Sequence, residues 1–337
     1  MAERPRENRN LFPGYPKGWF VIAFAEELPA FGILPANYFG RNLVLFRGED
    51  GAPRLLDTYC AHLGASLAAG GKVVGNSIEC PFHAWRYGGD GKCVEIPYAK
   101  KIPKKACVES WTVREQNGLI YMWHHPNPAH RMEPEFDIPV LEEWGKDGWT
   151  RWTMSKLPIK THPREIVENV VDKAHFPKVH NTHVDMFENE FDGPNATQRT
   201  RGVAYPLGGG KDEFEITATY FGPGYQLSWM KGVLEARLLN AHTPVDLENL
   251  DLRFGVLLKF VGNEEKTKKF ATMYAENLRL GFHQDIQIWE NKKYREVPVL
   301  CDGDGPIIKL RQWYSQFYGQ GDGKTTLPVA TAADEAE

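Results

Sequence analysis

The chain has 337 residues, a formal net charge of −4, 42% hydrophobic and 25% charged residues. These values are typical of a globular protein of one or two domains, and the weak negative charge gives no reason to expect a nucleic acid or an anionic membrane as partner. No run approaches the length of a membrane span, the N-terminus lacks the apolar core of a signal peptide, and the cysteines number five. We therefore expect a cytoplasmic protein whose cysteines are reduced or bind metal.

Residues 1–17 are charged and rich in proline, so we expect an irregular arm. Residues 18–128 contain short strand-like runs joined by turns. These runs are GWFVIAF, RNLVLFRGEDGAPRLLDTYC and CVESWTVREQNGLIYMWHH. The last run contains Asn117-Gly118, a typical hairpin turn. The sequence therefore predicts an N-terminal all-β domain.

Two Cys-His pairs lie within this β-rich region: Cys60 with His62, and Cys80 with His83. A zinc finger groups its cysteines together and its histidines together near a helix, whereas each pair here mixes one thiol with one imidazole on a loop. The arrangement favours a [2Fe-2S] cluster in which thiolates bind one iron and imidazoles the other. A structural zinc site is the alternative. The other cysteines have no such partners, and we expect small core residues at Cys93, Cys107 and Cys301.

The segments YCAHLG and CPFHAWRYGGDGKC resemble the Rieske domain of non-haem iron oxygenases. The resemblance implies that Cys60 and Cys80 bind one iron of the cluster and that His62 and His83 bind the other. It also implies that the ring of Trp85 packs near the cluster. An ordinary core role for Trp85 is the alternative.

The segment HHPNPAHRMEPEFDIP predicts a linker, and residues 129–320 predict a second domain. HPREIVENVVDKAHF has an apolar stripe at helical spacing. Strands are predicted at FEITATYFG, YQLSWMKGV, LDLRFGVLLKFVG and KKFATMYAEN, and helices at HQDIQIWENKKY and IIKLRQWYSQFYG. Helices on one antiparallel sheet give an α+β fold, here a helix-grip-like domain. We expect disorder at residues 321–337.

A second set of potential metal ligands follows the linker. His175 and His180 lie five residues apart, which on an ideal helix is about 140° of rotation, so both cannot reach one metal without a distortion. Pro177 lies between them, and we expect a break or an end there that turns His180 back towards His175. Two histidines with one carboxylate form the facial triad of mononuclear non-haem Fe(II).

Asp172 is the nearest carboxylate, one helical turn before His175. The resemblance implies a different role for it: linking the two metal sites by accepting a hydrogen bond from a Rieske histidine of a neighbouring subunit. It implies that the third iron ligand is Asp285, in a C-terminal helix. The competing carboxylates in that region are Glu276 and Glu290.

Other polar residues near the predicted iron helix are assigned by position. His183 could compete as a ligand, although a surface or pocket role is favoured, and Asn169 is expected to line the iron pocket. Other histidines have no pairing that distinguishes them from solvated or core residues, for example His124, His125 and His162.

Within the oxygenases, the sequence is most similar to oxygenase components of 3-ketosteroid 9-alpha-hydroxylases and related sterol enzymes, through segments such as YFGRNLVLFR, IPYAKKIP and HQDIQIWENKKY. This similarity implies a terminal monooxygenase that uses O2 to hydroxylate an apolar steroid-like or polycyclic substrate. It further implies a head-to-tail homotrimer. Electrons must come from a separate NAD(P)H-dependent reductase or ferredoxin, because no nucleotide-binding glycine fingerprint is present.

Three alternatives remain open at this stage. The same centres could catalyse dealkylation, desaturation or aromatic dihydroxylation. The chain could be an electron carrier with an inactive second domain. It could also be a zinc-stabilised module that binds a lipid without chemistry.

Overall fold

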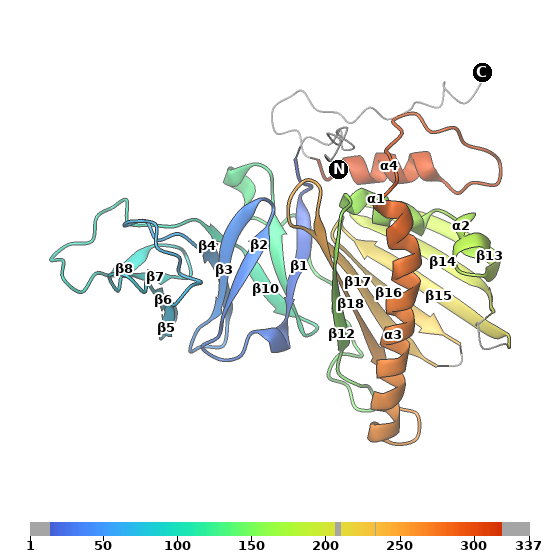
Figure 1. The fold of residues 1–337 in the computed structure, drawn as a ribbon, viewed down its shortest axis with the longest axis horizontal. Coiled ribbons are helices and arrows are strands. Elements are labelled where there is room, and N and C mark those ends of the chain that lie inside the picture. The colour runs from blue at the N-terminus through green and yellow to red at the C-terminus, as the bar shows by residue number, and fades with distance from the viewer. Residues whose placement is uncertain (1–13, 206–209, 233, 319–337) are drawn as a thin grey trace, which may run out of the picture. The chain divides into compact units, whose positions relative to one another are not determined.

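The computed structural model describes residues 14–205, 210–232 and 234–318. These residues form two compact units (Figure 1). One unit is Gly18–Val140, and the other contains the described residues outside that range. Most of the arm expected at residues 1–17, and all of the tail expected at residues 321–337, lie outside the described residues. Among the described helices, none is both long and apolar enough to cross a membrane.

The first unit contains three antiparallel sheets, as the all-β expectation requires (Figure 1). Their strand orders are β1-β11-β10, β2-β3-β4-β9 and β5-β6-β7-β8. The strands are β1 (Gly18–Phe24), β2 (Ile33–Tyr38), β3 (Arg41–Arg47), β4 (Pro53–Asp57), β5 (Lys72–Val74), β6 (Ser77–Glu79), β7 (Arg86–Gly88), β8 (Cys93–Glu95), β9 (Ser110–Trp111), β10 (Val113–Gln116) and β11 (Leu119–His124). The predicted hairpin turn joins β10 to β11, with φ of 56° at Asn117 and 73° at Gly118.

The predicted linker packs on the first unit. The indole of Trp19 donates to the carbonyl of Phe136 at 2.7 Å, and the amide of Gln116 donates to the carbonyl of Ile138 at 2.7 Å. Side chains of the sheet thus satisfy the carbonyls of this proline-rich segment. The boundary predicted at residue 128 consequently falls inside the compact unit that ends at Val140.

The second unit is a seven-stranded antiparallel sheet in the order β12-β18-β17-β16-β15-β14-β13 (Figure 1). Its strands are β12 (Thr153–Ile159), β13 (Thr182–Asp192), β14 (Asn195–Ala204), β15 (Asp212–Phe221), β16 (Tyr225–Lys231), β17 (Ala236–Pro244) and β18 (Leu250–Leu258). Helix α3 (Glu264–Trp289) packs on the sheet through Ala271, Phe282 and Trp289, and α4 (Ile307–Ser315) follows it. The predicted α+β class is confirmed.

One predicted strand is wrong: KKFATMYAEN lies inside α3. The helix begins earlier than expected because the side chain of Asn263 accepts a hydrogen bond from the backbone of Lys266 at 2.8 Å. The buried residues Thr267, Ala271 and Ala275 then recur at helical spacing against the sheet. The cap and this spacing outweigh the alternation of apolar residues that suggested a strand.

Candidate metal centres

Cys60 and Cys80 begin two loops whose backbone hydrogen bonds and dihedral angles match. The N–H of Cys60 donates to the carbonyl of Ala65 at 2.9 Å, and that of Cys80 donates to the carbonyl of Trp85 at 2.8 Å. Four residues after each cysteine the backbone is left-handed, with φ of 77° at Gly64 and 56° at Ala84. The two loops therefore present their Cys and His side chains in matching ways.

The four side chains of these loops lie together. Both thiols belong to residues that are 3% exposed, and the rings of His62 and His83 have centroids 4.7 Å apart. The Nδ1 atom of His62 is buried without a hydrogen-bond partner in the protein, which suits a nitrogen that binds a metal. These residues fit a [2Fe-2S] cluster.

Each loop contributes one thiol and one imidazole. This composition fits the two irons of a cluster, of which one is bound by thiolates and the other by imidazoles.

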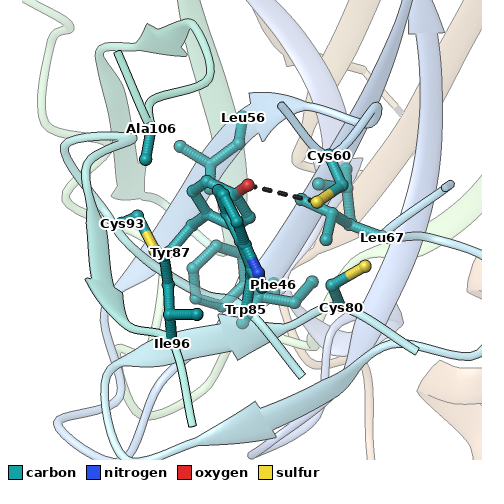
Figure 2. Close-up of a cluster of buried hydrophobic side chains, with 12 residues drawn as sticks. Phe46, Leu56, Cys60, Leu67, Cys80, Trp85, Tyr87, Cys93, Ile96 and Ala106 are labelled. Atoms are coloured by element: carbon teal, nitrogen blue, oxygen red, sulfur yellow. Dashed lines mark hydrogen bonds between the residues drawn. The ribbon is translucent and has the colours of Figure 1, made fainter. Parts of the chain in front are cut away.

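Two aromatic side chains flank the cluster loops (Figure 2). The ring of Trp85 stacks on His62, with centroids 4.6 Å apart and planes at 6°. The hydroxyl of Tyr87 lies 3.1 Å from the Cys60 Sγ and accepts a hydrogen bond from the Ala61 N–H at 3.2 Å. Trp85 is thus both a core residue and a neighbour of His62, whereas sequence reasoning missed Tyr87.

The other cysteines divide by environment. Cys93 is buried, in agreement with the core role expected for it. Cys107 and Cys301 are exposed, so the same expectation is wrong for them. Both follow turns or loops at the surface, where a lone cysteine in the sequence carries no burial signal.

The segment that carries His175 and His180 breaks earlier than predicted. The structure divides the expected helix into α1 (Pro163–Val167), the 3-10 helix η3 (Glu168–Val170) and α2 (His175–Val179). The break precedes His175, and Pro177 lies inside α2. Proline is tolerated there because the first turn of a helix needs no intrahelical N–H partner. Helix α2 ends at Val179, which leaves His180 as its C-cap.

His175, His180 and Asp285 converge as the predicted triad requires. One ligand atom of each lies within 4.8 Å of the others. The rings of the two histidines have centroids 5.2 Å apart, and the Asp285 Oδ1 lies 3.4 Å from the His180 Nε2. Burial alone would lower the pKa of His180, but the hydrogen bond and charge of Asp285 outweigh burial and raise it.

Both imidazoles are oriented by oxygen atoms behind them. The Nδ1–H of His175 donates to the carbonyl of Asp172 at 2.6 Å, and the Nδ1 of His180 lies 3.3 Å from the Oε1 of Gln284. Because these oxygens can only accept, the Nδ1 atoms carry the protons and the Nε2 lone pairs face the centre of the triad. This donor set fits a divalent iron.

The Asp172 carboxylate stands beside the triad. It accepts hydrogen bonds from the backbone N–H groups of Ala174 at 3.1 Å and His175 at 3.3 Å. Burial by itself raises the pKa of the Asp172 carboxyl. The hydrogen bond and charge of His175, together with these N–H groups, lower that pKa by more, so the net shift is downward. Its side chain is 40% exposed and thus accessible from outside the site.

The competing ligands lie elsewhere. His183 is exposed and pairs with Asp185 at 3.2 Å. Glu276 pairs with Arg279, and Glu290 accepts a hydrogen bond from the backbone of Lys160. Three further histidines are also engaged, His124 stacking on Phe39, and His125 and His162 in hydrogen bonds.

The triad opens into a cavity between the sheet and α3. Asn169 lines this cavity, and its Oδ1 accepts a hydrogen bond from the Trp289 indole at 3.4 Å. Most of the lining is apolar, but β14, β16 and β17 contribute polar residues that sequence reasoning missed: Gln198, Gln226, Ser228 and Asn240. The Asn240 Oδ1 is buried without a hydrogen-bond partner. Residues of four strands line this cavity together, so no pattern within a single strand could have predicted it.

Two protein families match this chain. Residues 18–111 match the Rieske [2Fe-2S] domain, and residues 122–318 match the 3-ketosteroid 9alpha-hydroxylase C-terminal domain. An oxygenase component of 3-ketosteroid-9-alpha-monooxygenase from Rhodococcus rhodochrous is 38% identical over 319 residues, covering 90% of this chain and 81% of the relative. A protein of the same name from Mycobacterium tuberculosis is 35% identical, covering 90% and 82%.

Two further similarities are more distant. Cholesterol 7-desaturase of Xenopus laevis is 30% identical, covering 97% of this chain and 77% of the relative. The crystal structure of dicamba monooxygenase bound to dicamba superposes with a TM-score of 0.73 at 20% identity, covering 89% of this chain and 96% of the other. This last similarity concerns the fold.

Proposed function

The chain belongs to the Rieske non-haem iron oxygenases, in the family of 3-ketosteroid-9-alpha-monooxygenase oxygenase components, and on this basis we propose that it hydroxylates a steroid-like apolar substrate. The observation that carries the proposal is the His175, His180 and Asp285 triad opening into a mostly apolar cavity that also holds a few polar side chains. Such a cavity suits a mostly apolar ligand with a polar group at a fixed position.

The ligand assignments form part of this proposal. Cys60 and Cys80 hold one iron of the cluster, and His62 and His83 hold the other. His175, His180 and Asp285 hold the mononuclear iron. When bound, the two centres together supply O2 activation, with electrons that enter at the cluster.

The protein side chains position and orient these groups. The carbonyl of Asp172 and the amide of Gln284 keep the Nε2 lone pairs of His175 and His180 directed inward. Asn169 and Trp289 hold one wall of the cavity through their hydrogen bond. Leu278 and Phe282 on α3 provide apolar surface that excludes water from the bound substrate.

The Asn240 Oδ1 can accept a hydrogen bond from a hydroxyl of the substrate. A buried acceptor without a partner in the protein is costly unless a ligand donates to it. This favours a steroid that carries a hydroxyl over a plain polycyclic hydrocarbon. Desaturation is the alternative reaction, since a cholesterol desaturase is also similar, at lower identity than the hydroxylases.

The partners and assembly complete the proposal. A separate NAD(P)H-dependent reductase or ferredoxin delivers electrons, and the enzyme works in the cytoplasm as a head-to-tail homotrimer. In such a ring, Asp172 receives a hydrogen bond from a cluster histidine of the next subunit. Its accessible, ionised side chain supports this role.

Incubating the iron-loaded, reduced protein with O2 and a panel of 3-ketosteroids and polycyclic hydrocarbons tests the proposal. Mass spectrometry should show the gain of one oxygen on a steroid. Loss of two hydrogens would identify a desaturase instead, and no product from red, iron-loaded protein would contradict the steroid assignment. The control is His175→Ala, which should keep the cluster colour and lose turnover.

A further inference from the structure

We propose that the loop of residues 97–106, here called the basic loop, is the docking surface for an acidic electron-donor protein. The loop lies between β8 and β9 and carries four lysines: Lys100, Lys101, Lys104 and Lys105. This inference rests on the proposed function only in requiring a cluster that accepts electrons from outside.

The basic loop is connected to the cluster ligands. The indole of Trp85 donates to the hydroxyl of Tyr98 at 2.7 Å, and the same indole stacks on His62. The Tyr98 ring also lies edge-on to His83, with centroids 6.5 Å apart. Tyr98 of the basic loop thus contacts His83 and the residue that stacks on His62, so a protein seated on this loop would lie near the cluster ligands.

The backbone of the basic loop has defined turns. The N–H of Ala99 donates to the carbonyl of Ile96 at 3.1 Å, and that of Ala106 to the carbonyl of Pro103 at 2.9 Å. The N–H of Cys93 in β8 donates to the carbonyl of Ala106 at 2.9 Å and closes the loop. The lysines are thus presented from a fixed frame, which lowers the entropy cost of binding.

No acidic side chain within the basic loop balances its positive charge. All four lysines are exposed, residues 97–106 contain no Asp or Glu, and no ion pair to these lysines occurs among the described residues. The whole chain has a net charge of −4, so the loop is a local positive patch on an acidic protein. Such a patch attracts an oppositely charged surface and speeds its encounter.

The surroundings of the lysines indicate a protein as the occupant. Exposed apolar side chains accompany the charges, with Tyr98 and Phe82 each 62% exposed and Ile102 43% exposed. Protein interfaces combine an aromatic or apolar centre with a charged rim. The donor's reduced centre loses one electron, and the oxidised cluster gains that electron; no covalent bond forms or breaks.

The test uses a plant-type [2Fe-2S] ferredoxin of acidic charge as the probe, with the iron-loaded protein. The variant carries Lys100→Glu, Lys101→Glu, Lys104→Glu and Lys105→Glu. At low salt, stopped-flow absorbance should show that the reduced probe reduces the cluster of this variant at least about tenfold more slowly than that of the unchanged protein. The reason is that the substituted loop repels the acidic probe. The dissociation constant of the oxidised probe, measured by calorimetry, should rise in parallel, and added salt should remove the difference.

A matched variant with the same change in net charge is the control: Lys146→Glu, Lys160→Glu, Lys231→Glu and Lys266→Glu, all exposed lysines of the second unit. It should slow reduction by less than about threefold. Equal slowing in both variants, or no slowing in the first, would overturn the proposal. A loop variant that changes the oligomeric state in light scattering would assign the loop to a second copy of this chain. Failure of excess dithionite to bleach any of the proteins would instead contradict the proposed function.

Discussion

Candidate metal ligands can be proposed from sequence because their chemistry restricts both residue type and spacing. The pairs Cys60-His62 and Cys80-His83, taken together, indicate a cluster site from the sequence alone. The atoms that orient such ligands are different. The Gln284 amide behind His180 and the Tyr87 hydroxyl beside Cys60 come from distant segments, and many residue types could occupy those positions. Their roles follow only from the fold.

Asn240 provides a prediction at this scale. Asn240→Leu should lower kcat/KM for a hydroxysteroid about tenfold, since one hydrogen bond to a buried polar group is worth about 1 to 2 kcal/mol. The melting temperature should not fall, because the variant removes an Oδ1 that has no partner in the protein. Steady-state kinetics and thermal unfolding measure the two effects. A polycyclic hydrocarbon is the control substrate, and an equal loss with it would exclude a role for Asn240 in accepting a hydrogen bond from the substrate hydroxyl.

Among the secondary-structure elements, the segment from α1 to α2 departs most from its prediction. Periodicity predicted one helix over HPREIVENVVDKAHF, and most of its apolar stripe is buried, although Ala174 is exposed. The chain nevertheless turns after η3. The buried Glu168 carboxylate of η3 accepts hydrogen bonds from the Arg311 Nε at 2.8 Å and from the Lys292 Nζ at 3.0 Å. These partners come from α4 and from the segment after α3. Local pattern cannot show a helix end that distant charges determine.

Gly305 provides the element-scale prediction. A Cβ at this position would overlap the carbonyl of Val171, which lies in the break between η3 and α2. Gly305→Ala should therefore displace the backbone that leads to Asp172 and His175. We expect destabilisation of about 1 to 3 kcal/mol and weaker iron retention. Urea denaturation and metal analysis after dialysis measure both.

The matched control for Gly305 is Gly281→Ala within α3, on the helix that carries Asp285. A Cβ there meets no atom within 4 Å. This substitution should stabilise the protein by up to about 1 kcal/mol, because alanine favours a helix interior over glycine. Normal stability and iron content in Gly305→Ala would show that the break tolerates movement.

For the whole molecule, two buried histidines determine the response to mild acid. Burial lowers the pKa of His162 and of His242 to about 3, so both are neutral when folded. In the unfolded chain they take up protons near the ordinary value of 6.5. Their stabilising effect is therefore complete above pH 6.5 and is lost as the pH falls towards 3, by about 1.4 kcal/mol per pH unit for each histidine.

His242→Gln should roughly halve the decrease in unfolding free energy between pH 6.5 and 5, since one of the two groups no longer titrates. Burial raises the pKa of the Glu165 carboxyl, but the nearby Arg164 and Lys292 outweigh burial and lower it to about 2. Such a carboxylate loses its contribution to stability only below its ordinary pKa of 4.5. It therefore does not affect this window. Urea denaturation at each pH gives the slope, with visible absorption reporting cluster retention. His183→Gln, at an exposed position, is the control and should leave the slope unchanged.

The proposed ring of three subunits makes the largest-scale prediction. Two inactive variants can be co-expressed with different tags: His83→Ala, which lacks the cluster, and His175→Ala, which lacks the mononuclear iron. A mixed ring always has one junction where an intact cluster faces an intact iron of the next subunit. Tandem affinity purification should therefore recover rings with about one third of the normal turnover, because a head-to-tail ring has three equivalent junctions. Each variant alone should be inactive. Inactive mixed rings would mean that electrons pass within one chain, and the role proposed for Asp172 between subunits would then be excluded.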